Sequence, residues 1–249
     1  MTSHSEASTA LPEPNKGLSG IVAADTTLSF IDGEKGILKY CGYGIDDLAA
    51  SSSFEEVVCL LYDRSLPSRE RLVDMRARIG AARVLPSEVK KVIEQLAGRT
   101  SPMSTLRTVV SALGHYESNV PLKELPPKAL RLVGQIAAAV AMIHRLREGQ
   151  APIEANPERG HAADFLHMLL GREVTETQAQ ALDLYLILLA DHGFNASTFS
   201  GRVTAGTLAN LHSAITSSVG TLSGPLHGGA NEKAMEMIIT IGSPAAAEA

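Results

Sequence analysis

The sequence has few aromatic residues and no tryptophan. Phenylalanine and tyrosine make up 4% of its 249 residues, whereas hydrophobic residues together make up 45%. A core must therefore be built from aliphatic side chains, and long runs of leucine, alanine, valine and isoleucine favour helices that pack on helices. The length allows one large domain or two small ones.

Cysteine is also scarce, and the patterns of a leader or a membrane span are missing. The two cysteines, Cys41 and Cys59, have no CxxC spacing, so no disulfide framework is implied. Residues 1–14 lack the basic and apolar blocks of a signal peptide, and no apolar run reaches about 18 residues. We therefore expect a cytoplasmic protein with no membrane partner.

Positive charge is not in excess, and several motifs are absent. The chain has 22 basic and 27 acidic residues and a net charge of −5, so it has no electrostatic footprint for nucleic acid. It contains no P-loop, no GxSxG and no dinucleotide fingerprint. No histidine pair has HxxxH spacing with a carboxylate, so we expect no metal site.

The composition and the pattern of apolar residues favour an all-α protein, a multi-helix bundle with a short extended segment near the N-terminus. Residues 1–16 are polar and predict a disordered tail, and 17–30 predict extended chain before a hairpin turn at Asp32-Gly33. Helix start and stop signals follow along the rest of the chain. They predict helices over 53–62, 68–82, 87–98, 102–116, 126–148, 161–170, 175–192 and 232–240.

Two of these helices have patterns that predict burial. The middle of the long helix, 136–143, is apolar nearly all round and should lie inside the bundle. Its charged end, Arg145 to Glu148, predicts a solvated face. The helix over 175–192 opens with a Thr-Glu-Thr-Gln capping box and is expected to turn a set of apolar side chains inward. These are Leu182, Leu184, Tyr185, Leu186, Leu188 and Leu189.

Two histidines lie on turns next to helices. His227 stands in the stretch 224–231, whose sequence is Gly-Pro-Leu-His-Gly-Gly-Ala-Asn. Glycine allows tight turns and close approach, and the helix start behind it offers N–H groups to a polarised oxygen. His192 stands in the stretch 190–199, whose sequence is Ala-Asp-His-Gly-Phe-Asn-Ala-Ser-Thr-Phe.

The two histidines can share a site only if the chain between them folds back. A single straight helix over 196–217 would separate its ends by roughly 33 Å. We therefore predict a break near 206–210, with Asn210 as the N-cap of the second helix.

Together these stretches resemble the citrate synthase family. The family carries an Ala-Asp-His segment followed shortly by Asn-Ala-Ser-Thr, and then Gly-Pro-Leu-His-Gly-Gly-Ala-Asn. Residues 31–48 also resemble its N-terminal segment. The resemblance implies condensation of acetyl-CoA with oxaloacetate to citrate and CoA, with the coenzyme A thioester as a substrate and no covalently bound cofactor. It also implies that the chain forms a homodimer.

The resemblance also implies roles for individual residues. It makes His227 the catalytic donor to the enolate oxygen, while His192 and Asn195 contact oxaloacetate. Asn195 alternatively holds the turn. The thioester would approach the backbone around the residues that flank the catalytic histidine. These are Leu226, Gly228, Gly229, Ala230 and Asn231.

Three positions depart from the family pattern. Cys41 stands where the family's Tyr-Arg-Gly-Tyr has arginine, Ser101 replaces the histidine of His-Pro-Met, and Gly193 replaces the glutamate after His192. The charge of the first and the imidazole of the second are thereby lost, and the third substitution loosens the turn.

The resemblance covers 17–242 as a large helical domain, with 243–249 as the start of a hinge. The family's small domain holds a Gly-His-Arg segment, a catalytic aspartate and the arginines that hold oxaloacetate, and none of these can be assigned here. We therefore expect the chain to be incomplete and inactive alone. The alternatives are a non-catalytic scaffold that pairs with a full-length subunit, a propionyl-CoA donor as in 2-methylcitrate synthase, and the reverse reaction of citryl-CoA lyase.

Overall fold

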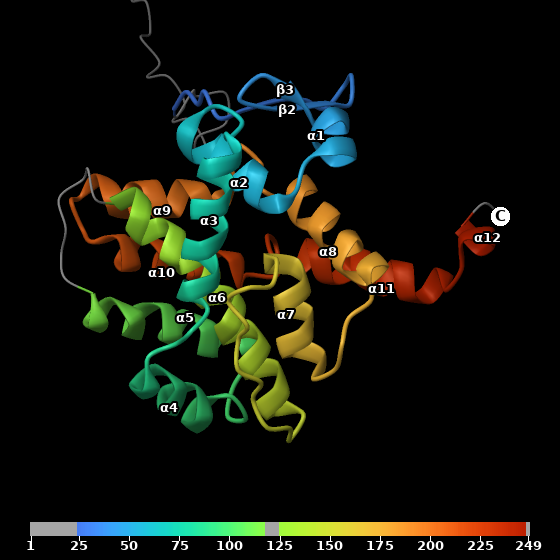
Figure 1. The fold of residues 1–249 in the computed structure, drawn as a ribbon. Helices are drawn as coiled ribbons and strands as arrows, with labels where there is room; N and C mark the ends of the chain where they lie inside the picture. The colour runs from blue at the N-terminus through green and yellow to red at the C-terminus, as the bar shows by residue number, and fades with distance from the viewer. Residues whose placement is uncertain (1–23, 118–124, 248–249) are drawn as a thin grey trace, which may run out of the picture.

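The extended N-terminal segment forms a small antiparallel sheet at one end of the molecule (Figure 1). The computed structural model describes residues 24–117 and 125–247. Its strands pair in the order β1-β2-β3, with Asp32 opposite Ile37, so the predicted hairpin turn is confirmed. The predicted tail, 1–16, lies outside the described residues. The strands are β1 (Ser29–Asp32), β2 (Ile37–Tyr40) and β3 (Tyr43–Gly44).

Helices make up most of the rest of the described chain, which confirms the all-α class. In chain order they are α1 (Ile45–Ser51), α2 (Phe54–Asp63), α3 (Arg69–Ala82), α4 (Ser87–Leu96), α5 (Pro102–Leu113), the 3₁₀ turn η1 (Gly114–Tyr116), α6 (Leu125–Arg147), α7 (His161–Leu170), α8 (Glu176–Leu188), α9 (Ala196–Gly206), α10 (Leu211–Leu222), α11 (Gly229–Ile241) and α12 (Pro244–Ala247). The sequence signals missed α1, which is one short helix of seven residues. The hinge predicted at 243–249 overlaps α12 and stays a prediction.

Side-chain caps explain most of the helix starts. Ser53 and Thr175 form capping boxes at α2 and α8, and Ser68 accepts the Arg71 backbone N–H at α3. Helix α4 starts without a side-chain cap, because Pro86 holds the N-cap position and Ser87 is the first residue of the helix. The helix still forms, since its apolar residues face the core.

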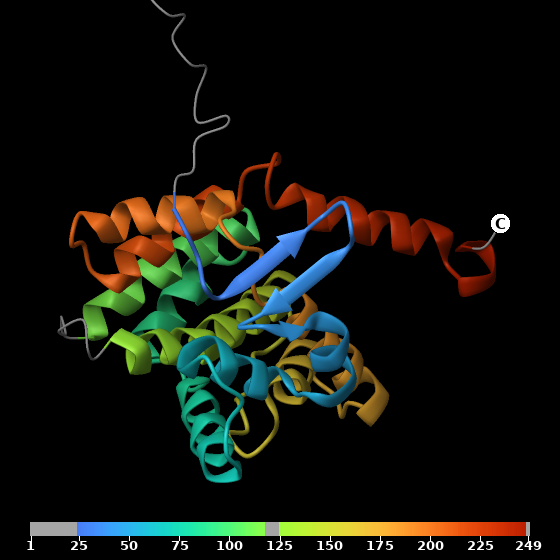
Figure 2. The same ribbon diagram turned by 90° about the horizontal axis from the view of Figure 1, so that it is seen from above.

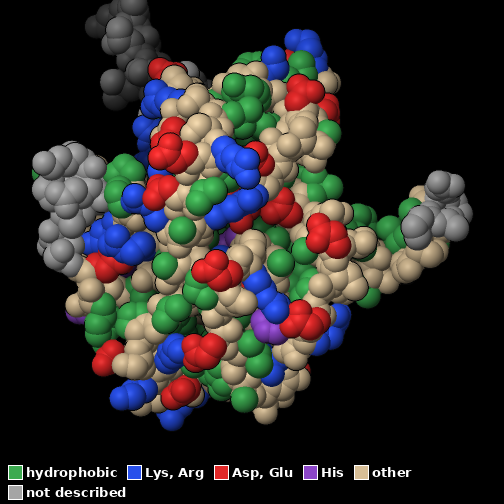
Figure 3. Space-filling view, viewed as in Figure 1, with side chains coloured by type: hydrophobic (Ala, Val, Ile, Leu, Met, Phe, Trp, Pro, Cys, Tyr) green, Lys and Arg blue, Asp and Glu red, His purple; other side chains and the backbone are tan. Residues whose placement is uncertain are grey.

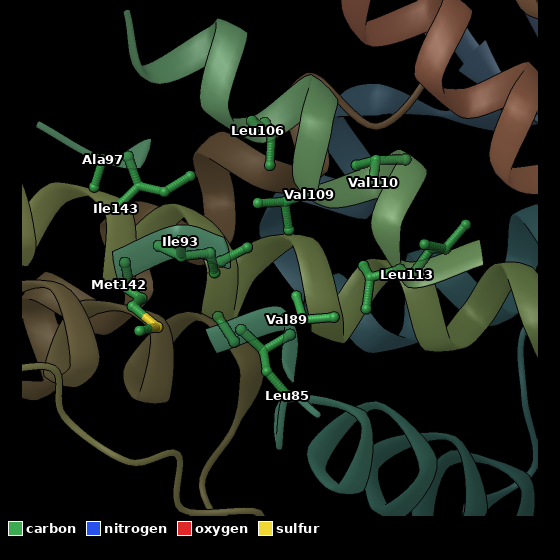
Figure 4. Packing of buried hydrophobic residues seen from close by; sticks show 14 of the residues in the cluster. Leu85, Val89, Ile93, Ala97, Leu106, Val109, Val110, Leu113, Met142 and Ile143 are labelled. Carbon is green, nitrogen blue, oxygen red and sulfur yellow. The ribbon is translucent and has the colours of Figure 1, made fainter. Parts of the chain in front are cut away.

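The core is aliphatic and centres on α6, as the composition predicts (Figure 4). Side chains from α4 and α5 meet the middle of α6, where Met142 and Ile143 lie buried. By length and composition α6 would also be able to cross a membrane, but 61% of its most apolar window is buried by neighbouring helices, as in the core helix of a globular protein. The labelled core residues in Figure 4 are Leu85, Val89, Ile93, Ala97, Leu106, Val109, Val110, Leu113, Met142 and Ile143.

Two expectations about exposure are wrong. In the charged end of α6, Arg147 and Glu148 are exposed as predicted, but Arg145 is buried, because its guanidinium turns back to donate to the Ala151 carbonyl at 2.6 Å. In α8 the buried residue is Ile187, whereas Leu184, Tyr185, Leu188 and Leu189 are 39–48% exposed. The apolar run 184–189 has apolar side chains on more than one face of the helix. Only one of these faces packs against other described residues, so the side chains on the others are exposed. Helix α8 also ends at Leu188, earlier than predicted.

The predicted fold-back between the two histidines is confirmed. Helices α9 and α10 pack side by side as a hairpin, and Asn210 caps α10 by accepting the Ser213 backbone N–H at 2.9 Å. Helix α11 then leaves the body of the molecule and extends away from it, as two views show (Figure 2). In the space-filling view its outer part stands clear of the body (Figure 3).

Candidate active site

His227 is held by a tight turn rather than by a long flexible segment. The Gly224 carbonyl accepts the backbone N–H groups of His227, at 3.0 Å, and of Gly228, at 3.1 Å. A Cβ atom at Gly228 would collide with the Leu222 carbonyl oxygen, so the close return of the chain at this point requires glycine. The turn therefore fixes the direction in which the half-buried imidazole leaves the backbone.

Ser197 links the two histidine segments. Its hydroxyl lies 2.7 Å from His227 Nε2, and its backbone carbonyl accepts the Ser218 hydroxyl of α10 at 2.9 Å. Ser197 belongs to the first turn of α9, five residues after His192, so this contact places both histidine segments at the same end of the α9–α10 hairpin. Sequence reasoning missed Ser197. The available signal was its position two residues after the N-cap Asn195.

His192 lies exposed on the loop between α8 and α9. Asp191 Oδ1 accepts the Gly193 backbone N–H at 2.7 Å, and Gly193 has φ +61°, a conformation that glycine adopts at no steric cost. Asn195 ends the loop as the N-cap of α9, where its Oδ1 accepts the Thr198 backbone N–H at 2.9 Å. The capping interpretation of Asn195 is thus confirmed, and its contact with substrate stays a prediction.

The backbone N–H groups after His227 are less available than the sequence implied. The His227 carbonyl accepts the Ala230 N–H at 3.3 Å, and the Gly228 carbonyl accepts the Asn231 N–H at 3.2 Å. These bonds thus engage both donors within the first turn of α11. Leu226 is fully exposed, and Asn231 is exposed as well. A role for this stretch in binding coenzyme stays a prediction.

The histidine site is open, and a separate apolar cavity lies elsewhere. That cavity has a volume of about 510 Å³ and is lined by residues of α2, α6, α7, α8 and α10, with neither His192 nor His227 in its wall. At the edge of the histidine site, the Arg202 guanidinium lies 5.0 Å from the centre of the Phe194 ring. Within the part of the chain that the structure describes, no group of three or more His, Cys, Asp or Glu residues is arranged to hold a metal ion.

The two departures outside the histidine loop have local structural roles. Cys41 has φ +47° and its thiol contacts the Leu60 carbonyl at 3.5 Å, while burial raises the pKa of the thiol. Ser101 is the N-cap of α5 and accepts the Ser104 backbone N–H at 3.2 Å. Each side chain therefore supports the backbone at its own position.

An all-α protein that holds two imidazoles on turns, one of them hydrogen-bonded to a serine, has the groups that an enzyme uses to polarise carbonyl oxygens. Comparisons with known proteins narrow this class. Residues 17–249 match the family model for the citrate synthase C-terminal domain. The chain belongs to the citrate synthase family, a family of acyltransferases.

Individual relatives agree with this membership. The chain is 44% identical over 233 residues to the citrate synthase of Haloferax volcanii, a match that covers 91% of this chain and 62% of the relative. The citrate synthase structure from Pyrobaculum aerophilum is 38% identical, with a TM-score of 0.83 over 90% of this chain and 59% of that one. A Thermoplasma acidophilum citrate synthase, solved with carboxymethyl coenzyme A and oxaloacetate, is 31% identical, with a TM-score of 0.86 over 95% of this chain and 63% of that one. The chain thus spans about three fifths of the length of these relatives.

Proposed function

We propose that this chain supplies the histidine-bearing part of a cleft that condenses acetyl-CoA with oxaloacetate to give citrate and CoA. The observation that carries the proposal is the 2.7 Å contact between Ser197 and His227, which joins the two motifs at one end of the α9–α10 hairpin. The Thermoplasma acidophilum relative, which shares this fold, binds a coenzyme A analogue together with oxaloacetate.

His227 stabilises the enolate in this proposal. When the Ser197 hydroxyl donates to Nε2, the imidazole carries its proton on Nδ1 and can donate it to the thioester oxygen. A base removes a proton from the acetyl methyl group as that oxygen gains negative charge. We assign the base to no residue of this chain.

His192 acts on the second substrate. The enolate carbon attacks the keto carbon of oxaloacetate, and the new carbon–carbon bond places negative charge on the keto oxygen. His192 donates a hydrogen bond to this oxygen, which takes up a proton to become the hydroxyl of citryl-CoA. Water then cleaves the thioester and releases citrate and CoA.

The stretch after His227 is the proposed coenzyme site. Gly229 has room for an approaching ligand, since a Cβ atom there would lie 3.8 Å from Pro225 Cβ, its nearest neighbour. Leu226, Ala230 and Asn231 are exposed beside it, and Gly228 shapes the turn. Because this surface is open, excluding water from the reaction requires a second surface to close over it.

Two alternatives remain open to experiment. Two 2-methylcitrate synthases, from Shewanella oneidensis and Mycobacterium tuberculosis, are 37% and 39% identical to this chain, which favours propionyl-CoA as a second candidate donor. Alternatively the chain is a non-catalytic scaffold that pairs with a full-length subunit.

Release of free CoA thiol tests the proposal. We expect the purified chain to release no thiol from acetyl-CoA and oxaloacetate above the rate without protein. We expect turnover from an extended form, in which this chain is joined to the part of the Haloferax volcanii relative that the match does not cover. Substituting propionyl-CoA in the same assay distinguishes the two donors. A scaffold would release no thiol in either form, and turnover by the chain alone would contradict the need for a second surface.

A further inference from the structure

The side chain of Tyr40 reaches from the N-terminal sheet to the loop that carries His192. Tyr40 ends β2, it has no exposed surface, and its hydrogen-bond partners lie about 150 residues later in the chain. We infer that Tyr40 is a positioning residue for His192, an inference that rests on the proposed function of that histidine. The three-stranded sheet then helps to position the proposed active site.

Three hydrogen bonds join the Tyr40 hydroxyl to the backbone of this loop. The hydroxyl lies 3.1 Å from the Leu188 carbonyl and 3.2 Å from the Asp191 carbonyl, and it accepts the Asp191 backbone N–H at 3.3 Å. A phenol hydroxyl has one proton to donate and lone pairs that can accept. The two carbonyls therefore share its proton, while its oxygen accepts the Asp191 backbone N–H.

The hydrogen bond from Tyr40 to the Leu188 carbonyl supplies a partner that helix α8 itself cannot provide. The Leu188 carbonyl belongs to the last turn of α8, where carbonyl groups have no partner within the helix. Tyr40 therefore caps the end of α8 from another element, and Asn195 caps the start of α9. The loop between them, with His192 near its middle, is fixed at both ends.

The sheet also contacts the loop beside His192. A Cβ atom at Gly193 would lie 3.6 Å from Ile31 Cδ1 and 3.7 Å from Ser29 Oγ, so β1 passes directly next to the turn. The Tyr40 ring is held in turn by a buried cluster that includes Leu48 and Ile187. Burial raises the pKa of the Tyr40 hydroxyl, which therefore keeps its proton at neutral pH. The cluster fixes the ring, and the hydroxyl fixes the loop.

Hydrogen exchange of the wild-type chain gives a first test that needs no variant. The Asp191 amide lies outside the helices, yet its bond to Tyr40 should protect it from exchange with solvent. Tyr40→Phe keeps the ring and removes the hydroxyl, and it should speed exchange of this amide by about tenfold, the loss expected for one hydrogen bond. The ring signals of His192 in NMR spectra should shift or broaden.

A matched variant separates positioning from general stability. Tyr62→Phe removes a hydroxyl from α2, where burial also raises the pKa, to about 12, and it should leave the Asp191 exchange rate and the His192 signals unchanged. An unprotected Asp191 amide in the wild type would overturn the inference. So would a Tyr40→Phe chain that changes loop exchange only in proportion to its global free energy of unfolding.

Turnover of the extended form gives a second readout. Tyr40→Phe should raise the KM for oxaloacetate by about tenfold and leave the KM for acetyl-CoA unchanged, because His227 lies outside the loop. Equal effects on both KM values would contradict positioning of His192. If the wild-type extended form shows no turnover, the proposed function fails, while hydrogen exchange still decides the role of Tyr40.

Discussion

Ser197 is the residue through which the two motifs meet. It stands in the first turn of α9 with its hydroxyl on His227 Nε2 and its carbonyl on the Ser218 hydroxyl of α10. In the proposed mechanism its hydroxyl donates to Nε2, which leaves the His227 proton on Nδ1. On that proposal, the orientation and the tautomer of the His227 imidazole depend on one side chain.

Replacing Ser197 by alanine should lower turnover of the extended form by about tenfold, since one hydrogen bond to the catalytic imidazole is lost. The measurement is kcat for thiol release at saturating acetyl-CoA and oxaloacetate. Ser200→Ala is the matched control, because Ser200 lies on the same helix and bonds the Ser217 hydroxyl of α10 instead. Equal losses from the two variants would show that the Ser197 effect comes from helix packing.

His161 gives the fold a pH dependence that is independent of the active site. It is 5% exposed, and its pKa is lowered to about 4, mainly by burial and also by the nearby positive charge of Arg83. The unfolded chain therefore binds a proton between pH 6.5 and 4 that the folded chain does not. Because the proton favours the unfolded state, stability falls as the pH decreases through this window.

His161→Gln should flatten this slope. Between pH 7 and 4.5 the wild-type free energy of unfolding should fall by about 2–3 kcal/mol more than that of the variant, as measured by urea unfolding. Asp183→Asn tests the sign of this pH dependence. Burial raises the pKa of Asp183 to about 6, so its ionisation destabilises the fold as the pH rises, and its removal should change the slope in the opposite direction. Matching slopes in wild type and His161→Gln would refute this account of His161.

The site residues differ in how far the sequence revealed them. The histidines, the glycines and Asn195 stand in long motifs that resemble those of the citrate synthase family, so they were candidate site residues from the sequence. Ser197 and Tyr40 act through contacts across 30 and about 150 residues of chain. The position of Ser197 beside Asn195 in the motif is a weak signal and Tyr40 has none, because their contacts arise only when the hairpin and the sheet are placed.

At the scale of elements, the α9–α10 hairpin decides whether the site exists. Its break follows from local chemistry. Helix α9 ends at Gly206, Leu208 has φ +63°, and Asn210 restarts the helix as an N-cap. The rise of an α-helix and the need to bring two histidines together are enough to predict this break.

Asn210→Ala should therefore destabilise the chain by about 1 kcal/mol, the usual loss for a helix N-cap. Urea unfolding at neutral pH measures it. Asn210→Asp keeps an oxygen that accepts the Ser213 N–H, and it should retain most of the wild-type stability. If alanine and aspartate behave alike, the cap contributes nothing to the hairpin.

Helix α8 shows where the reading of elements from sequence is limited. The apolar run around Leu184 to Leu189 predicted burial, yet four of its large side chains are exposed and Ile187 is the buried one. Periodicity shows that a helix has an apolar face. It does not show whether the residues that cover a second apolar face belong to the same part of the chain.

At the scale of the whole molecule, α11 is the helix whose apolar side chains the described residues leave exposed. Met235, Met237, Ile238 and Ile239 are 51–71% exposed, and the helix extends away from the body (Figure 2). Contiguous exposed apolar side chains of this kind mark an interaction surface. We propose that these side chains lie in the interface of the homodimer that the family resemblance implies.

We accordingly expect sedimentation equilibrium to give twice the mass of one chain. Ile239→Glu should shift the equilibrium towards the monomer, because a dimer would bury the added charge. Leu208→Glu is the control, since Leu208 is even more exposed than Ile239 but lies in the turn between α9 and α10. A monomer in the wild type, or equal effects of the two variants, would contradict this assignment of α11.

The central claim is that His227 and the His192 loop form one catalytic cleft, and the most direct test is the rate of thiol release by the extended form with and without the His227 imidazole. The account predicts turnover that requires both acetyl-CoA and oxaloacetate and that falls by about 10²–10³-fold in His227→Ala, as for the loss of a donor to a developing oxyanion. A rate that His227→Ala leaves unchanged would contradict it.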